Sequence, residues 1–157
     1  MKAQLPVTLV HKAAFCTGII GWVLGDRLIA AWSLFYFLPP DESQLPSRLP
    51  EWTLFGVITV WGLISILGRV VDSVVDPVVA NWSDKTRHAF GRRRVFLVAG
   101  VLPLAVCTGL LFFPPDETKT WANAIFAAVV MCAYFVAFTV YANPLQALMV
   151  DLGRTPK

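Results

Sequence analysis

Charged residues are scarce in this chain of 157 residues. Asp, Glu, Lys and Arg together make up 15% of it, whereas hydrophobic residues make up 57% and the mean hydropathy is +0.65. A soluble domain is usually about 25% charged, and its surface helices each show a polar stripe. Here the apolar residues instead form long runs separated by short charged clusters. This pattern excludes an ordinary soluble domain and indicates an integral membrane protein.

Residues that commonly build catalytic and metal sites are also few, with two histidines and three cysteines. Cys16, Cys107 and Cys132 all lie in apolar runs without metal-ligand spacing, so we interpret them as packing residues. The sequence shows no nucleophile–base pair, metal cluster or phosphate-binding loop, so we expect neither an enzyme nor a bound cofactor. The arginine run lies between apolar segments, and we therefore expect no nucleic-acid partner.

Four apolar segments reach about 20 residues, the length that an α-helix needs to cross a bilayer. Paired prolines at positions 39–40 and 114–115 end two of them, because proline cannot continue a helix. The sequence thus predicts an all-α integral membrane fold with four transmembrane helices, at about residues 12–38, 52–80, 95–113 and 120–149.

The distribution of Lys and Arg predicts how these helices are oriented. If the N-terminus is cytoplasmic, the opposite side keeps only Arg48 and Lys119 among its basic residues, next to several acids. Lys and Arg are enriched on the cytoplasmic side of membrane proteins. We therefore expect a multi-pass protein of the cell (inner) membrane with both termini cytoplasmic. The basic residues on that side are then Lys2, Lys12, Lys85, Arg87, Arg92, Arg93, Arg94, Arg154 and Lys157.

The second apolar segment contains three ionisable residues, Arg69, Asp72 and Asp76. Residues three or four apart share one face of a helix, with Cβ atoms about 6 Å apart. Two buried carboxylates this close repel, so one takes a proton unless a cation lies between them. Asp72 and Asp76 are therefore a candidate site for Na⁺ or H⁺, and Arg69 can keep one carboxylate charged while the site is empty. The alternative is a neutralised Arg–Asp cluster that only fixes helix packing.

A second pair of ionisable residues, Asp26 and Arg27, lies near the middle of the first segment. Adjacent residues point about 100° apart on a helix, so each needs a partner elsewhere. The carboxylate suits a polyhydroxylated substrate, and the arginine suits hydroxyls or an acid group. An equally open alternative is that Arg27 pairs with Asp72 or Asp76 across helices for structure alone.

The segment after the second helix follows an ordered pattern, DP-x₂-A-x₃-DKTR-x₃-GRRR, at residues 76–94. Membrane topology explains a basic cytoplasmic loop but not this order. Asp84 is placed to bond Arg87 or a neighbouring helix end, and so to act as a latch that opens when domains rock. The candidate gating residues are Asp84, Lys85, Arg87, Arg92, Arg93 and Arg94.

This segment resembles the loop-2/3 signature of the major facilitator superfamily. Together with YANPLQALMVDLGRTP at residues 141–156, it is most similar to the glycoside–pentoside–hexuronide:cation symporter branch, which includes the melibiose carrier. The resemblance implies that the chain is the N-terminal part of a twelve-helix fold. It also implies a secondary active transporter that couples a sugar or similar small solute to Na⁺ or H⁺. The expected partners are that solute, membrane lipid and the remaining helices of the carrier.

The resemblance assigns roles to individual residues. Asp72 and Asp76 match the acids that coordinate the coupling cation, and Arg69 matches the arginine one turn earlier. Asp26 or Arg27 falls where the first helix contributes a sugar-binding acid. The melibiose carrier has an acid two residues before the helix-4 proline, where this chain has Ala142 followed by Asn143. This difference favours H⁺ as the coupling ion. The candidate substrate contacts are Asp26, Arg27, Arg69 and Asn143.

Four helices supply two-thirds of one six-helix half of such a transporter. We therefore expect that this chain is a portion of a longer carrier, whose reading frame continues past Lys157 into further spans. The alternative is a stand-alone four-helix membrane protein with an assembly or regulatory role, which predicts a stable oligomer after detergent extraction.

Overall fold

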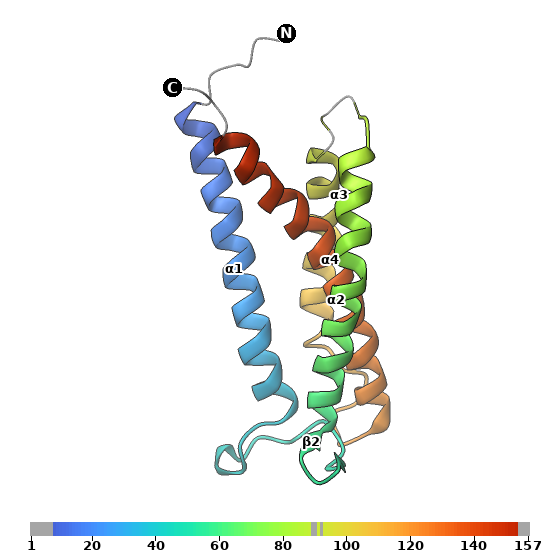
Figure 1. Cartoon of the computed structure of the whole chain (residues 1–157). Helices are drawn as coiled ribbons and strands as arrows, with labels where there is room; N and C mark the ends of the chain where they lie inside the picture. The colour runs from blue at the N-terminus through green and yellow to red at the C-terminus, as the bar shows by residue number, and fades with distance from the viewer. Residues whose placement is uncertain (1–7, 89–90, 92, 154–157) are drawn as a thin grey trace.

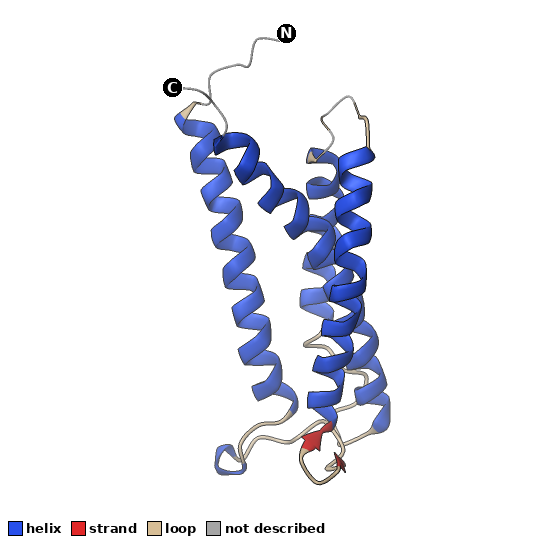
Figure 2. Ribbon diagram, in the orientation of Figure 1, coloured by secondary structure: helices blue, strands red, loops and turns tan. Residues whose placement is uncertain are grey.

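A computed structural model describes residues 8–88, 91 and 93–153. Its four helices are α1 (Leu9–Phe37), α2 (Val60–Lys85), α3 (Arg94–Leu110) and α4 (Trp121–Gly153). They alternate in direction, so that α1 and α3 begin where α2 and α4 end, at the same end of the bundle (Figure 1). We call the opposite end the outer end, because acidic residues prevail in its connections. A single-turn helix, η1 (Asp41–Ser43), lies there. A small antiparallel pair, β1 (Thr53–Leu54) and β2 (Ile58–Thr59), lies there too (Figure 2).

Within the described part of the chain, two helices are long and apolar enough to cross a membrane by length and composition. The candidate spans are Lys12–Phe37 of α1 and Trp121–Met149 of α4. α3 is apolar but shorter, and α2 contains the charges of Arg69, Asp72 and Asp76 within its length. The fold is thus the expected four-helix all-α arrangement, with the charged side chains concentrated on α2.

The start of α2 differs from the prediction, which placed it near residue 52. The apolar residues that precede Val60 instead form the β1–β2 hairpin. Phe55 and Gly56 at its turn have φ angles of 55° and 70°, a left-handed conformation that a right-handed helix does not accept. Thr59 then caps α2, because its side-chain oxygen accepts a hydrogen bond from the N–H of Gly62. The other helix ends lie within a few residues of the predicted positions.

α4 is the central helix of the bundle, because α2 and α3 both pack closely against it. Of the most apolar stretch of α4, 44% is buried, compared with 6% of the corresponding stretch of α1. Small residues allow the close approach. A Cβ at Gly100 of α3 would lie 3.0 Å from the backbone nitrogen of Tyr141, and Gly68 of α2 lies directly against Phe135. The α2–α4 contact therefore depends on the absence of a side chain at position 68.

Gly68→Ala should destabilise the bundle, because the added Cβ would lie 2.6 Å from two ring atoms of Phe135. Overpacking of this kind typically costs about 1–3 kcal/mol. Denaturant unfolding of the protein in detergent micelles measures the change. Gly21→Ala is the matched control, since a Cβ at Gly21 meets nothing within 4 Å. If both variants unfold at the wild-type midpoint, the close α2–α4 contact is wrong.

At the outer end, Asn123 joins two connections of the chain. Its side chain is fully buried. The Nδ2 atom donates to the carbonyl oxygens of Arg48 at 3.0 Å, Asp116 at 2.9 Å and Thr118 at 2.9 Å. The Oδ1 atom accepts the backbone N–H of Asp116 at 3.1 Å. One side chain thus fixes the α1–α2 connection to the α3–α4 connection.

Contacts of Arg48 and Tyr36 link these connections to the end of α1 and to the residues that follow α3. Nη1 of Arg48 donates to the carbonyl of Tyr36 at 3.0 Å, and the guanidinium lies 4.0 Å from the centre of the Tyr36 ring. The Tyr36 hydroxyl donates to the carbonyl of Phe112 at 2.9 Å. Phe37 stacks on Trp61 with ring centroids 5.0 Å apart. All four helices are therefore connected at the outer end.

Two acids in the outer connections are held in their charged form. The ammonium of Lys119 pairs with the carboxylate of Glu51 and lowers the pKa of Glu51. The pKa of Asp116 is lowered because its carboxylate accepts hydrogen bonds from the backbone N–H and the hydroxyl of Thr118. Both acids are therefore ionised at neutral pH, as expected for groups on the aqueous side of the bundle.

Candidate cation and solute site

The carboxylate of Asp72 faces α4, where a hydroxyl meets it. Thr139, which is only 1% exposed, donates to Oδ1 of Asp72 at 2.6 Å. Oδ2 of the same carboxylate lies 3.9 Å from Nη1 of Arg69, one turn earlier on α2. The Asp72 side chain is 18% exposed. It is thus a largely buried carboxylate with one neutral donor and one cationic neighbour.

Asp76 meets α4 one turn further along. Nδ2 of Asn143 donates to both the backbone carbonyl and Oδ1 of Asp76, each at 3.2 Å. Asn143 was predicted as a substrate contact, and the structure places it against the second acid of the predicted cation pair. The two acids on α2 therefore meet two polar residues on α4 at the same four-residue spacing.

Thr139 was not predicted from the sequence, because an uncharged residue inside an apolar run carries little signal. A signal did exist, since Thr139 and Asn143 are four residues apart, as are Asp72 and Asp76. Two polar residues at this spacing share one face of a helix, and an α2–α4 pairing brings such faces together. The site combines two carboxylates, one hydroxyl and one amide, which are oxygen-bearing groups suited to a hard cation.

Arg69 extends the site towards the space between α1, α2 and α4. Its guanidinium lies 4.7 Å from the centre of the Phe135 ring, and its side chain is 57% exposed. It also lines a cavity of about 180 Å³, to which Asp26 and Tyr134 contribute as well. Arg69 is therefore the side chain that borders both the predicted cation pair and a cavity reached by the first helix.

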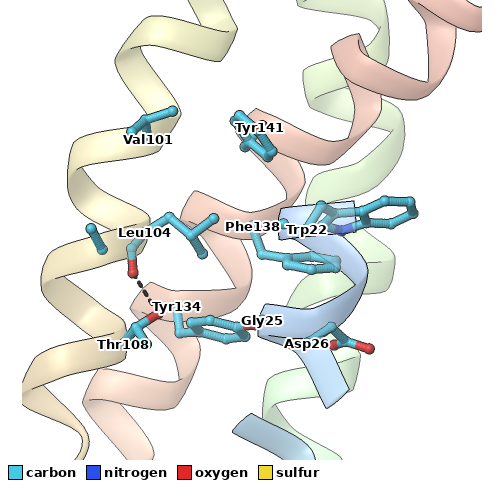
Figure 3. A pocket seen from close by; sticks show the side chains of 11 residues that line it. Trp22, Gly25, Asp26, Val101, Leu104, Thr108, Tyr134, Phe138 and Tyr141 are labelled. Carbon is cyan, nitrogen blue, oxygen red and sulfur yellow. Dashed lines mark hydrogen bonds between the residues drawn. The ribbon is translucent and has the colours of Figure 1, made fainter. Parts of the chain in front are cut away.

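Asp26 lines a second, larger cavity of about 400 Å³, which lies between α1, α3 and α4 (Figure 3). Tyr134 of α4 borders both cavities too, so Asp26 and Tyr134 form a shared wall. Arg27 is exposed and lines neither cavity. Among the described residues, no ion pair joins it to Asp72 or Asp76, so the alternative of an Arg27 cross-helix pair is not observed.

An ion pair links the last turn of α2 to the start of α3, at the end opposite the outer end. Oδ1 of Asp84 lies 3.7 Å from Nη2 of Arg93, and Nη1 of Arg93 donates to the carbonyl of Ala147 on α4. Asp84 was expected to meet Arg87 or a neighbouring helix end, and the described contact is with Arg93, the residue that precedes α3. Lys85, Arg87 and Arg94 are exposed. Arg92 lies outside the described residues.

In residues 8–88, 91 and 93–153, no three His, Cys, Asp or Glu side chains gather as they would around a metal ion. The candidate ion site thus consists of two carboxylates, Asp72 and Asp76, with Thr139 and Asn143 opposite them on α4 and Arg69 beside them.

Comparison with known proteins gives a consistent result. Residues 56–157 match the family model described as MFS/sugar transport protein. Over 160 aligned residues, which include 97% of this chain, 24% are identical to an uncharacterized symporter of Synechocystis. The lactose permease of Lactobacillus helveticus is 25% identical over 85% of the chain. The sucrose transport protein SUT4 of Oryza sativa is 32% identical over 57% of the chain.

The chain spans only part of these relatives. It aligns with 27% of the Synechocystis symporter, 20% of the lactose permease and 18% of the sucrose transport protein. No solved structure matches it.

Proposed function

Because the chain belongs to the MFS/sugar transport protein family, we propose that it forms the first four helices of a carrier that imports a sugar together with a cation. The match to the family model and the four-helix fold make it a membrane protein with the N-terminal helices of the major facilitator architecture. Carriers of this architecture bind their solute near the bilayer midplane, between two six-helix halves.

The observation that carries the proposal is the polar contact between α2 and α4. Two acids one turn apart on α2 meet Thr139 and Asn143 on α4. Ionisable residues inside membrane helices are costly and usually functional. Neighbouring carboxylates repel unless a proton or cation neutralises them. We therefore assign Asp72 and Asp76 to the coupling ion, H⁺ or Na⁺, with Arg69 as the counter-charge for Asp72 while no ion is bound.

The solute is assigned to the space beside α1. Asp26 lines both cavities and offers carboxylate oxygens to sugar hydroxyls, and Arg69 borders the smaller cavity with donors of its own. Arg27, exposed on α1, would have to meet the solute or a further helix of the carrier. The names of two relatives, a lactose permease and a sucrose transport protein, support a sugar as the class of solute.

The ion pair between Asp84 and Arg93 is proposed as the cytoplasmic latch. Arg93 connects α2 to the beginning of α3 and, through Ala147, to α4. A pair of this kind can break and reform when the halves of a transporter rock. Residues Lys85, Arg87 and Arg94, exposed at the same end, complete a basic surface that favours a cytoplasmic position in the inner membrane.

Uptake by cells that express the carrier containing this chain tests the proposal. Radiolabelled sucrose or lactose should accumulate in them, and the accumulation should depend on a Na⁺ gradient or a pH gradient. Collapse of the responsible gradient with an ionophore should stop it. A chain that inserts in the membrane as a stable oligomer but supports no uptake of any sugar in a broad panel would contradict the carrier and favour the stand-alone alternative.

A further inference from the structure

We propose that Trp22 is a solute-contacting residue, and that its indole N–H donates to a sugar hydroxyl in the larger cavity beside Asp26. This inference rests on the proposed function and names a residue that the sequence analysis did not select. Trp22 and Asp26 are four residues apart on α1 and both line the cavity of about 400 Å³ (Figure 3). Cavities of about 300–1,000 Å³ are typical of small-molecule sites.

The first argument is the unused donor of Trp22. Its Nε1 atom is buried, and it makes no hydrogen bond to any of the described residues. An indole nitrogen can only donate, and a buried donor without an acceptor costs free energy. Buried tryptophans usually have an acceptor for the N–H. Because Trp22 lines the cavity, a hydroxyl of the bound solute is the acceptor that this proposal supplies.

The second argument is that the cavity pairs this donor with an acceptor. The carboxylate of Asp26 accepts hydrogen bonds and, when ionised, donates none. Donor and acceptor come from the same face of α1, one turn apart. Each sugar hydroxyl both donates and accepts, so two neighbouring hydroxyls satisfy both groups together. Thr108 is less suited, because its hydroxyl already donates to the carbonyl of Leu104 at 2.7 Å.

The third argument is the aromatic lining. The ring centroid of Phe138 lies 5.9 Å from that of Trp22 and 5.8 Å from that of Tyr134. All three rings border the cavity. Aromatic faces are negative and attract the weakly positive C–H groups of a sugar ring, while the hydroxyls at its edge remain available for hydrogen bonds. A largely apolar surface that carries the Trp22 donor and the Asp26 acceptor therefore fits a sugar better than it fits an ion or a purely apolar ligand.

The test compares Trp22→Phe with wild type in the carrier that contains this chain, with radiolabelled sucrose and lactose as probes. Phenylalanine keeps an aromatic ring but removes the N–H. The KM for uptake should rise about five- to tenfold with little change in maximal rate, because the lost bond is made to bound solute. Trp32→Phe is the matched control. Trp32 is on the same helix, is 55% exposed and lines neither cavity, so its variant should keep the wild-type KM.

Deoxy analogues of the transported sugar distinguish a direct contact from a packing effect. At the hydroxyl that Trp22 meets, the deoxy analogue should raise the KM of wild type but not that of Trp22→Phe. The inference is overturned if Trp22→Phe keeps the wild-type KM, or if every deoxy analogue affects both proteins equally. Lack of uptake by wild type itself contradicts the proposed function first, and this inference with it.

Discussion

Asp72→Asn should reduce cation-coupled uptake by the carrier at least about 100-fold. Replacing a residue that only orients an ion's ligand typically costs roughly 10- to 100-fold, and Asp72 is proposed to contact the ion itself. Asparagine has nearly the size of aspartate, and its carbonyl can still accept the hydrogen bond from Thr139. The change therefore removes the charge and little else. Asp76→Asn should have a similar effect, because Asp76 is the second acid of the α2–α4 contact.

Measurement of this effect requires the same amount of protein in the membrane for each variant, checked by immunoblot of the membrane fraction. Ser73→Ala is the neighbouring control, because Ser73 is exposed and its hydroxyl donates to the carbonyl of Arg69 on its own helix. It should transport at the wild-type rate. Undiminished uptake by Asp72→Asn and Asp76→Asn, with the same ion dependence as wild type, would remove both acids from the mechanism.

Asn123→Ala should be the most destabilising single polar substitution at the outer end, by roughly 3 kcal/mol. The side chain is fully buried and bonds three backbone carbonyls and one backbone N–H. Alanine leaves these groups without their partner, and each buried group left unsatisfied costs about 1–3 kcal/mol. Local relaxation and entry of water keep the total well below the sum of the separate costs.

The loss of stability is measured by denaturant unfolding in detergent micelles, with circular dichroism as the signal. The matched control is Asn81→Ala, since Asn81 is an exposed asparagine on α2 and a surface substitution usually changes stability by less than about 0.5 kcal/mol. Equal unfolding midpoints for the two variants would mean that Asn123 does not hold the outer connections together.

The charged residues of α2 were the easiest part of the site to predict from the sequence. A helical spacing of three or four places side chains on one face whatever the helix packs against, so this spacing alone groups Arg69, Asp72 and Asp76. Proline pairs similarly mark where α1 and α3 end, because the restriction is local to the proline ring. Features set by the backbone of one segment can be predicted in this way.

Features that depend on which helices meet could not be predicted. Thr139 became a site residue only through the α2–α4 contact. A bond from Asp84 to a neighbouring helix end was expected, but that the partner is Arg93 at the start of α3 depends on where α2 and α3 lie relative to each other. The hairpin before α2 was missed for another reason. Its apolar residues extend the hydrophobic run of the helix, and only the left-handed φ at Phe55 and Gly56 separates the two.

Arg69 lies beside both the predicted cation site and the smaller cavity, and this position couples the binding of the ion to the binding of the solute. The same guanidinium lies 3.9 Å from Asp72 and lines the cavity to which Asp26 contributes. Neutralising Asp72 with the coupling ion removes its attraction for the guanidinium, which leaves Arg69 free to contact a solute in that cavity. Under the proposed function, thermodynamic reciprocity then fixes the result. The factor by which the ion tightens sugar binding must equal the factor by which the sugar tightens ion binding.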